Sequence, residues 1–360
     1  MQSLPGQHRP SILRLKDGSI FRGTSFGAPI PASGEVVFNT GMIGYPETLT
    51  DPSYHGQILV LTYPLIGNYG VPAPTRDHEL VSCFESDDIH IAGLVVSRYI
   101  DTYSHWNAAQ SLAAWLQEHH IPAITGIDTR ELTKRLRKKG TMPGTISASG
   151  KHTRIFDPAK RNLVADVSTS IPVTYTRGKK TIILVDCGVK NNIIRAFLNR
   201  NFTVKRVPWD YDFTAENVDG IVLSNGPGDP RKCKETITHT KDALQHTTPI
   251  LGICLGSQIL ALAAGAQTYK LKYGHRSQNQ PCVEAGTKRC YITSQNHGYA
   301  VDVTTLPEDW REWFYNNNDH TNEGIHHISR PFFGAQFHPE ASPGPDDTEF
   351  LFDLFVRAMR

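Results

Sequence analysis

The pattern of apolar and polar positions changes character near the middle of the chain. After residue 180, almost wholly apolar runs at 181–186, 202–207, 220–223 and 249–254 alternate with stretches of helical spacing at 190–200, 234–246 and 255–264. Wholly apolar strands that alternate with helices indicate a parallel sheet covered on both faces. We therefore predict an α/β domain over 181–360, with an open, mainly parallel sheet. Its strand-to-helix loops should share one edge, where such sheets place their sites.

Residues 1–150 have a different pattern. Residues 12–22 alternate around Asp17-Gly18, a good hairpin turn, and further apolar runs follow at 35–39, 57–62 and 91–97. Helical spacing appears at 106–119 and 129–138. These features predict a smaller, strand-rich α+β domain. Residues 151–180 are polar and contain Pro158 and Pro172, so we expect a linker there.

Composition narrows the possible partners. The 37 basic and 35 acidic residues leave a net charge of +2, which gives no electrostatic reason to expect nucleic acid or an anionic membrane as a ligand. The first ten residues lack the apolar core of a signal peptide, and the apolar run 249–266 is better explained by a buried strand and helix than by a membrane span. The six cysteines form no CxxC pair, so we expect free thiols in a cytoplasmic protein.

The pattern Gly-x-Cys-x-Gly joins the apolar strand at 249–254 to the following helix. Cys254 lies at its centre, between Gly252 and Gly256. This is the thiol version of the nucleophile elbow, in which a sharp turn leaves no room for side chains two residues to either side. The N-terminus of the helix favours the thiolate form of the cysteine. A small cysteine in a buried turn is the plainer alternative, and the two glycines make it the weaker one.

A thiolate nucleophile needs a base, and the best candidate is His338. It ends the apolar run 333–337 and is followed by Pro339 and Glu340. In an extended chain, residues i and i+2 point the same way, so we expect Glu340 to lie beside the imidazole and fix its tautomer. Taken alone, His-Pro-Glu would be a surface turn. Together with the cysteine elbow, it completes a Cys-His-Glu triad.

Two other polar segments fit the same site. The Gly/Pro loop 224–230 follows the strand 220–223 and lets backbone approach a ligand closely, which suits an oxyanion donor; a tight turn is the alternative. It lacks the phosphate-loop pattern. The segment Gln295-Asn296-His297-Gly298-Tyr299 offers amides and exposed backbone for a zwitterionic amino acid, although alone it is hardly distinguishable from a polar loop.

These motifs resemble the signature of class I glutamine amidotransferases, and in particular the small subunit of carbamoyl phosphate synthetase. The resemblance includes the N-terminal half, which most amidotransferases lack, and covers nearly the whole chain. The segments that carry it are 34–40, 49–54, 127–130, 224–230, 252–256, 295–298 and 337–345. It departs from the family pattern at Ser257, where His is frequent, at Tyr299, where Phe is common, and at Arg276-Ser277-Gln278, where the family is richer in glycine.

The resemblance implies a role for each matching residue. Cys254 would be the nucleophile, His338 the acid and base, and Glu340 its orienting carboxylate. Leu255 and Gly228 would supply the oxyanion N–H groups. The residues that would hold the glutamine are Ser53, Gly226, Gly228, Leu255, Gln258, Asn296, Gly298 and Tyr299.

The resemblance also implies a partner. Ammonia from glutamine would pass to a large carbamoyl phosphate synthetase subunit that binds ATP, with Mg²⁺, and bicarbonate. We find no nucleotide motif or metal site in this chain and expect no cofactor in it. Two alternatives stay open: a glutaminase subunit of another ammonia-using synthase, and a catalytically silent regulatory subunit. The N-terminal half argues against the first, and the intact triad argues against the second.

Overall fold

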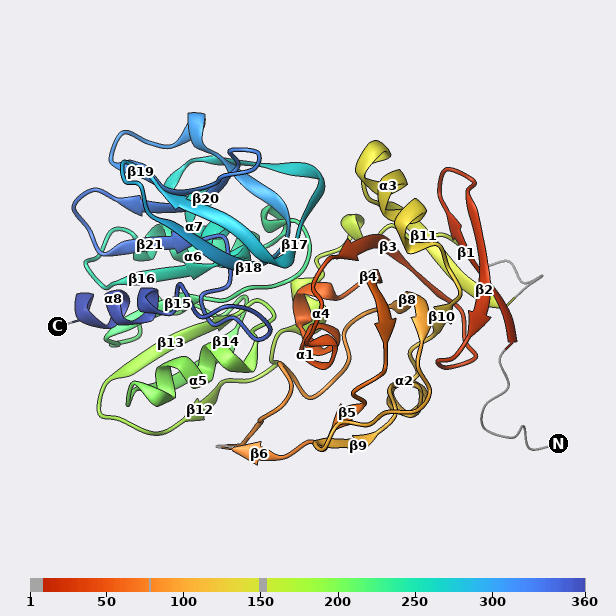
Figure 1. Cartoon of the computed structure of the whole chain (residues 1–360). Coiled ribbons are helices and arrows are strands. Elements are labelled where there is room, and N and C mark those ends of the chain that lie inside the picture. Colours follow the sequence, from red (N-terminus) through yellow and green to blue (C-terminus); the bar gives the residue numbers. More distant parts are fainter. Residues whose placement is uncertain (1–8, 78, 149–153, 360) are drawn as a thin grey trace. The chain divides into compact units, whose positions relative to one another are not determined.

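The chain divides after Lys160 into two compact units. The computed structural model describes residues 9–77, 79–148 and 154–359 (Figure 1). The boundary predicted at residue 150 lies outside the described residues. The predicted linker 151–180 needs correction after Lys160, because β12 (Val173–Tyr175) pairs with β14 (Thr203–Pro208) and so belongs to the C-terminal unit.

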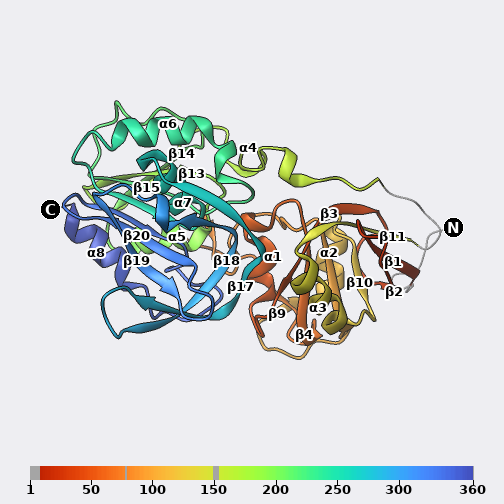
Figure 2. The same cartoon turned by 90° about the horizontal axis from the view of Figure 1, so that it is seen from above.

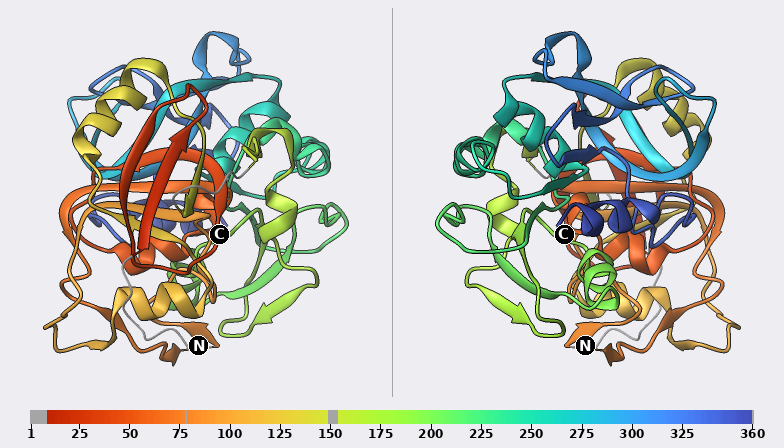
Figure 3. Two further views of the ribbon diagram at one scale, coloured as in Figure 1. Left: turned by 90° about the vertical axis from the view of Figure 1, so that its right-hand side faces the viewer. Right: turned by 90° about the vertical axis from the view of Figure 1, so that its left-hand side faces the viewer.

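A closed barrel forms the N-terminal unit, with the strand order β1-β11-β3-β4-β8-β10-β2. Its strands are β1 (Arg9–Leu15), β2 (Ile20–Ser25), β3 (Ala32–Asn39), β4 (Gln57–Ile66), β8 (Gly93–Tyr99), β10 (Ala123–Thr125) and β11 (Met142–Ala148). The predicted hairpin is confirmed: β1 and β2 pair antiparallel around Asp17-Gly18, with Arg14 opposite Ile20 (Figure 3, left, red). Strands β3, β4 and β8 are parallel to one another.

The N-terminal helices are α1 (Tyr45–Thr50), α2 (Leu112–Glu118) and α3 (Thr129–Lys139). The helix predicted at 129–138 is confirmed as α3, whereas the helix predicted at 106–119 begins too early. Ser111 caps α2 by accepting the N–H of Ala114, and β9 (Ala108–Gln110) precedes it. Short strands β5 (Val71–Pro72), β6 (Arg76–Asp77) and β7 (Leu80–Val81) lie outside the barrel. Leu112 and Leu116 of α2 share a core with Leu59 and Leu61 of β4.

The C-terminal unit is built on a ten-stranded sheet of order β12-β14-β13-β15-β16-β21-β20-β19-β17-β18. Its other strands are β13 (Thr181–Asp186), β15 (Gly220–Leu223), β16 (Ile250–Ile253), β17 (Gln267–Glu284), β18 (Cys290–Asp302), β19 (Trp310–Asn316), β20 (Asn322–His327) and β21 (Phe332–Ala335). The strands from β14 to β21 in this order are parallel, as predicted. The sheet then continues through antiparallel strands that the sequence did not reveal.

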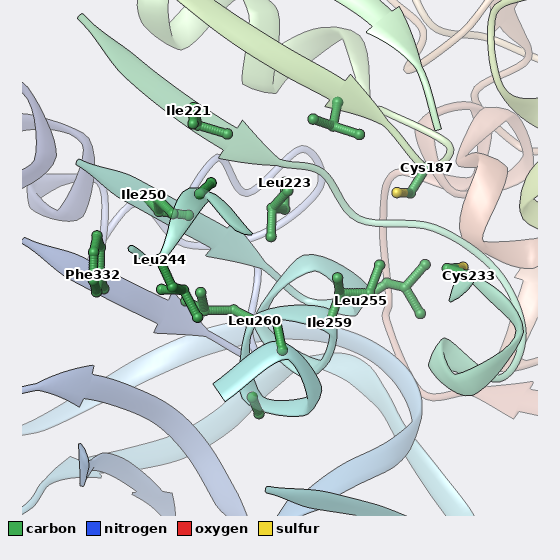
Figure 4. Close-up of a cluster of buried hydrophobic side chains, with 14 of the residues drawn as sticks. Cys187, Ile221, Leu223, Cys233, Leu244, Ile250, Leu255, Ile259, Leu260 and Phe332 are labelled. Atoms are coloured by element: carbon green, nitrogen blue, oxygen red, sulfur yellow. The ribbon is translucent and has the colours of Figure 1, made fainter. Parts of the chain in front are cut away.

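Helices cover both faces of the parallel strands, as predicted: α5 (Asn191–Asn199), α6 (Lys234–Ala243), α7 (Leu255–Ala264) and α8 (Phe350–Ala358). Ile221 and Leu223 of β15 pack in one cluster with Leu255 and Ile259 of α7 (Figure 4). Phe197 of α5 contacts Phe352 and Phe355 of α8. Helices α6 and α8 lie on opposite sides of the strands (Figure 2). None of the helices in the described ranges has the length and hydropathy needed to cross a bilayer.

Candidate active site

Cys254 occupies the sharp turn between β16 and α7. Its backbone has a φ of 52°, in the left-handed region that non-glycine residues rarely adopt. A Cβ atom on Gly252 would lie 2.5 Å from the carbonyl oxygen of Gly256, and one on Gly256 would lie 2.0 Å from that of Leu223. Neither position therefore accepts a side chain, which is the steric reason that the elbow pattern predicted.

The sulfur of Cys254 is buried, and its surroundings are polar. The residue is 2% exposed. Its Sγ lies 3.7 Å from the carbonyl oxygen of Asn296 and 3.6 Å from Nε2 of Gln336. The backbone N–H of Cys254 donates to the carbonyl of Ala335 at 2.8 Å, so β21 holds the elbow in place. The sulfur therefore lies between a carbonyl oxygen that can accept its proton and an amide that can donate to it.

His338 and Glu340 form the second part of the site. Nδ1 of His338 donates to Oε1 of Glu340 at 2.6 Å, and both side chains are buried. The extended geometry expected for this pair is wrong, because the N–H of Ala341 donates to the carbonyl of His338 and closes a turn. The turn still brings carboxylate and imidazole together. With Nδ1 donating, Nε2 is the nitrogen left to exchange a proton with the sulfur.

The charges around His338 favour its protonated form. Burial opposes protonation of the imidazole, but Glu340 and the neighbouring Cys254 outweigh it and raise the pKa of His338 to about 10. Nε2 is buried and makes no well-formed hydrogen bond to any of the described residues. The imidazole therefore interacts with the sulfur without a tight hydrogen bond, a state in which apo active sites are frequently found.

Lys190 is a site residue that sequence reasoning missed. It follows β13 at the carboxyl edge of the sheet, and its Nζ lies 3.0 Å from Oε1 of Glu340. Both side chains are almost wholly buried. Burial disfavours the charged carboxylate, yet Lys190 and His338 lower the pKa of Glu340 to about 2. A polar residue in the loop between a buried parallel strand and the next helix was the available signal.

The two predicted oxyanion donors follow parallel strands at this edge of the sheet. Leu255 is the first residue of α7, and within the described chain its N–H donates to no protein atom. Gly228 has a φ of 88° in the loop that follows β15. Gly226 in that loop is packed so closely that a Cβ atom would lie 1.9 Å from the carbonyl oxygen of Cys187. The N–H group of Gly228 is thus held in a conformation typical of glycine, and that of Leu255 is held at the start of a helix.

Two of the predicted glutamine-binding residues contact Cys254: the carbonyl oxygen of Asn296 lies 3.7 Å from its Sγ, and the N–H of Gln258 donates to its carbonyl at 3.3 Å. Asn296, Gly298 and Tyr299 belong to strand β18, so the polar-loop interpretation of 295–299 is wrong. Gln258 of α7 donates through Nε2 to the carbonyl of Tyr299 at 2.9 Å. Ser53 lies in the N-terminal unit, buried in η1 (Pro52–Tyr54), where its N–H donates to Asp51. Its role in binding glutamine stays a prediction.

A second buried cluster lies on the same antiparallel strands. His275 places Nδ1 3.1 Å from Oε1 of Glu323 and Nε2 2.8 Å from Oδ2 of Asp319. Burial opposes its charge, but the two carboxylates raise the pKa of His275 to about 9. His297 completes the one group in the described ranges that could hold a metal ion. An imidazolium that donates from both nitrogens has no lone pair for a metal, so these residues form an ion-pair network.

Comparisons with known proteins agree with this arrangement. The family model described as "Carbamoyl-phosphate synthase small chain, CPSase domain" matches residues 13–146, and "Glutamine amidotransferase class-I" matches residues 183–358. The arginine-specific carbamoyl phosphate synthase small chain of Neurospora crassa is 50% identical over 353 residues, which cover 95% of this chain and 78% of the relative.

Longer proteins also match. The multifunctional protein CAD of Squalus acanthias is 53% identical over 357 residues, which cover 97% of this chain and 16% of the relative. The multifunctional protein pyr-3 of Neurospora crassa is 50% identical over 384 residues, which cover 96% and 21% respectively. This chain thus spans about a fifth or less of these multifunctional relatives and about four fifths of the arginine-specific small chains.

Proposed function

This chain belongs to the family of carbamoyl phosphate synthase small chains, and from that premise we propose that it hydrolyses glutamine to glutamate and ammonia through a thioester on Cys254. The observation that carries the proposal is the buried arrangement of Cys254, His338 and Glu340. Glu340 binds one imidazole nitrogen, and the other is left for the sulfur. Nucleophile, base and orienting group are then in the order that covalent catalysis requires.

In the proposed reaction, the thiolate of Cys254 attacks the side-chain amide carbon of glutamine. The oxyanion that forms would be held by the N–H groups of Leu255 and Gly228, where one such donor is worth about 2.7–4 kcal/mol. The C–N bond breaks as Nε2 of His338 gives its proton to the departing ammonia. Water then loses a proton to His338, attacks the thioester and releases glutamate together with the free thiolate.

Glu340 and Lys190 support the proton transfers without touching the substrate. The carboxylate stabilises the imidazolium that gives a proton to ammonia and is formed again from water, and the ammonium of Lys190 favours the ionised form of that carboxylate in its buried position. Within the C-terminal unit, glutamine itself would be held by Gly226, Gly228, Leu255, Gln258, Asn296, Gly298 and Tyr299.

We further propose that the ammonia is used by a large synthetase partner, which would bind ATP, Mg²⁺ and bicarbonate. Multifunctional relatives that match over a fifth or less of their length are consistent with such a partner, since the matching segment there is part of a longer chain. Direct transfer would keep ammonia unprotonated, whereas ammonia released into neutral water becomes ammonium and loses its nucleophilicity.

The test compares two activities of the complex with its partner. Cys254→Ala should abolish carbamoyl phosphate synthesis from glutamine and leave synthesis from added ammonia intact. Glutamate release by the purified chain, with and without the partner, separates this proposal from a silent regulatory subunit, which would release none. A partner that makes a product other than carbamoyl phosphate would indicate a different synthase. Survival of both activities in the variant would overturn the assignment of the nucleophile.

A further inference from the structure

Gln336 is a third polar neighbour of the reactive sulfur, in addition to His338 and the carbonyl of Asn296. It follows β21, two residues before His338, and it is 1% exposed. Its backbone N–H donates to the carbonyl of Glu323 at 2.9 Å, which fixes its main chain to β20. Its side-chain amide reaches the site and places Nε2 3.6 Å from Sγ of Cys254.

The orientation of this amide follows from its neighbours. The carbonyl oxygen of Tyr299 can only accept, so the atom of Gln258 that lies 2.9 Å from it must be Nε2. The same Nε2 lies 2.9 Å from the side-chain oxygen of Gln336, which must therefore accept as well. Gln336 is left with its N–H₂ group facing the sulfur. A fixed backbone carbonyl thus determines, through two amides, that the sulfur receives a donor.

Loss of the thiol proton changes the contacts of the sulfur in opposite ways. As a thiol, Cys254 donates to the carbonyl of Asn296. As a thiolate it has no proton for that carbonyl, and it accepts from Gln336 instead. Hydrogen bonds to an ionised acceptor are about twice as strong as neutral ones, so the contact with Gln336 gains strength when the sulfur becomes charged. The contact with Gln336 therefore favours the thiolate, whereas the contact with the Asn296 carbonyl favours the thiol.

We propose that Gln336 holds the sulfur of Cys254 as a thiolate and links it, through Gln258, to the site that takes glutamine. The inference rests on the proposed glutaminase function and assigns a further residue to that reaction. Glutamine that engages Gln258 would act on the same amide pair that orients the donor to the sulfur. Binding of substrate and activation of the nucleophile are then connected by two buried side chains.

Two variants test the role of Gln336. Gln336→Met keeps the volume and removes the donor, whereas Gln336→Glu keeps the shape and places a carboxylate beside the sulfur. The measurement is thiolate ultraviolet absorbance against pH, taken as the difference between each protein and the same protein carrying Cys254→Ala. This difference isolates one sulfur among the six cysteines.

A matched control comes from a second glutamine that donates to a cysteine. Nε2 of Gln295 lies 3.2 Å from Sγ of Cys282, which the proposed reaction does not use. Gln295→Met therefore removes the same kind of hydrogen bond from a different sulfur. It should leave the titration of Cys254 where the wild-type protein has it.

We expect Gln336→Met to move the midpoint of the Cys254 titration upward by about one to two pH units, the size of one charged hydrogen bond. Glutamine hydrolysis at neutral pH should fall about 10- to 100-fold, more in kcat than in KM. Gln336→Glu should move the midpoint further in the same direction. Thermal unfolding checks that each variant is folded, and either variant alone is sufficient for the titration.

The two failures look different. Midpoints that stay at the wild-type value in a folded Gln336 variant would overturn the role of Gln336, whatever its effect on activity. Suppose instead that both Gln336 variants raise the midpoint of the Cys254 titration but the wild-type protein releases no glutamate. That result would overturn the glutaminase function and leave the contact between Gln336 and the thiolate standing.

Discussion

Two buried imidazoles in the C-terminal unit each pair with a buried glutamate, but they differ in how many of their ring nitrogens are hydrogen-bonded. His338 and His275 each lie within 3.1 Å of a buried glutamate, and the glutamates raise the pKa of both rings. His338 uses one nitrogen for its carboxylate, and the other makes no hydrogen bond to a described residue, although Cys254 lies close enough to raise the pKa of the ring. His275 uses both nitrogens, because Asp319 binds the second. Only a ring with a nitrogen to spare can exchange protons with a substrate, so the first pair suits catalysis and the second suits structure.

The glutamates that pair with these two rings also differ in their other partners. Glu340 is paired with Lys190, a buried cation that takes no part in the proposed proton transfers. Glu323 instead receives weaker hydrogen bonds, at 3.4 Å, from Asn316 and Thr321. A triad needs its carboxylate to stay ionised throughout the cycle, and Lys190 favours this by lowering the pKa of Glu340. The comparison therefore indicates what to change in each cluster and which property should respond.

Replacing each histidine in turn with asparagine should give the largest contrast in kcat. We expect His338→Asn to lower kcat for glutamine hydrolysis by about 10⁴-fold or more, because the variant can neither take up nor donate the protons of the reaction. Unfolding by urea should show it to be folded. Steady-state glutamate release with the partner present is the measurement.

His275→Asn is the matched control for that variant. It should lose stability, since Glu323 is left buried without its main partner, and should keep kcat within about tenfold of the wild-type value. A loss of activity as large as that of His338→Asn in a folded His275→Asn protein would contradict the division into a catalytic and a structural imidazole.

The features that could be predicted from the sequence are those that depend on a few neighbouring residues. The elbow follows from steric limits within five residues, and the structure shows the clashes that Gly252 and Gly256 avoid. Lys190 could not be recognised as a partner of Glu340, because 150 positions separate them and only the fold brings them together. Strands β17 and β18 mix charged and polar residues at the end of the sheet, so their sequences lack the apolar pattern that revealed β13 and β15.

The barrel illustrates the same limit. Its individual strands and its first hairpin are local features, and the sequence predicted several of them. Closure depends on β11 pairing with β1, where Leu13 lies opposite Ile146, and on β10 pairing with β2. Such pairings join strands about a hundred residues or more apart, and no turn or spacing signal in the chain specifies them.

Removing Lys190 tests the carboxylate side of the comparison. We expect Lys190→Met to reduce the free energy of unfolding by about 3–5 kcal/mol, because it leaves Glu340 buried with less compensating charge. Lys205→Met is the control: Lys205 pairs with Glu216 at 2.6 Å, but both side chains are about a quarter exposed. That variant should lose no more than about 1 kcal/mol in urea unfolding. Equal losses would show that burial of the Lys190 pair is unimportant.

The structural imidazole should reveal itself through pH. Folding raises the pKa of His275 from its ordinary 6.5 to about 9, so the folded protein binds its proton more tightly. The resulting stability is fully present below about pH 6.5 and is lost as pH rises through about 9. It corresponds to about 3 kcal/mol. We expect the stability difference between wild type and His275→Gln to shrink by that amount between about pH 6 and pH 10. A constant difference would contradict a buried, charged His275.

Asp319→Asn should have the smallest effect and still sharpen the comparison. The Asp319 side chain is 43% exposed, so water already screens its charge, and we expect a stability loss of about 1 kcal/mol or less at neutral pH. Asp309→Asn, which removes a similarly exposed partner of His327, should cost as little.

The two variants should differ in pH dependence. Asp319 is one of the carboxylates that raise the pKa of His275, so its loss should shift the fall in stability to lower pH, whereas Asp309→Asn should leave that fall in place. If both variants kept the wild-type profile, Glu323 alone would hold the proton on His275, and the second nitrogen of that ring would be as available as that of His338.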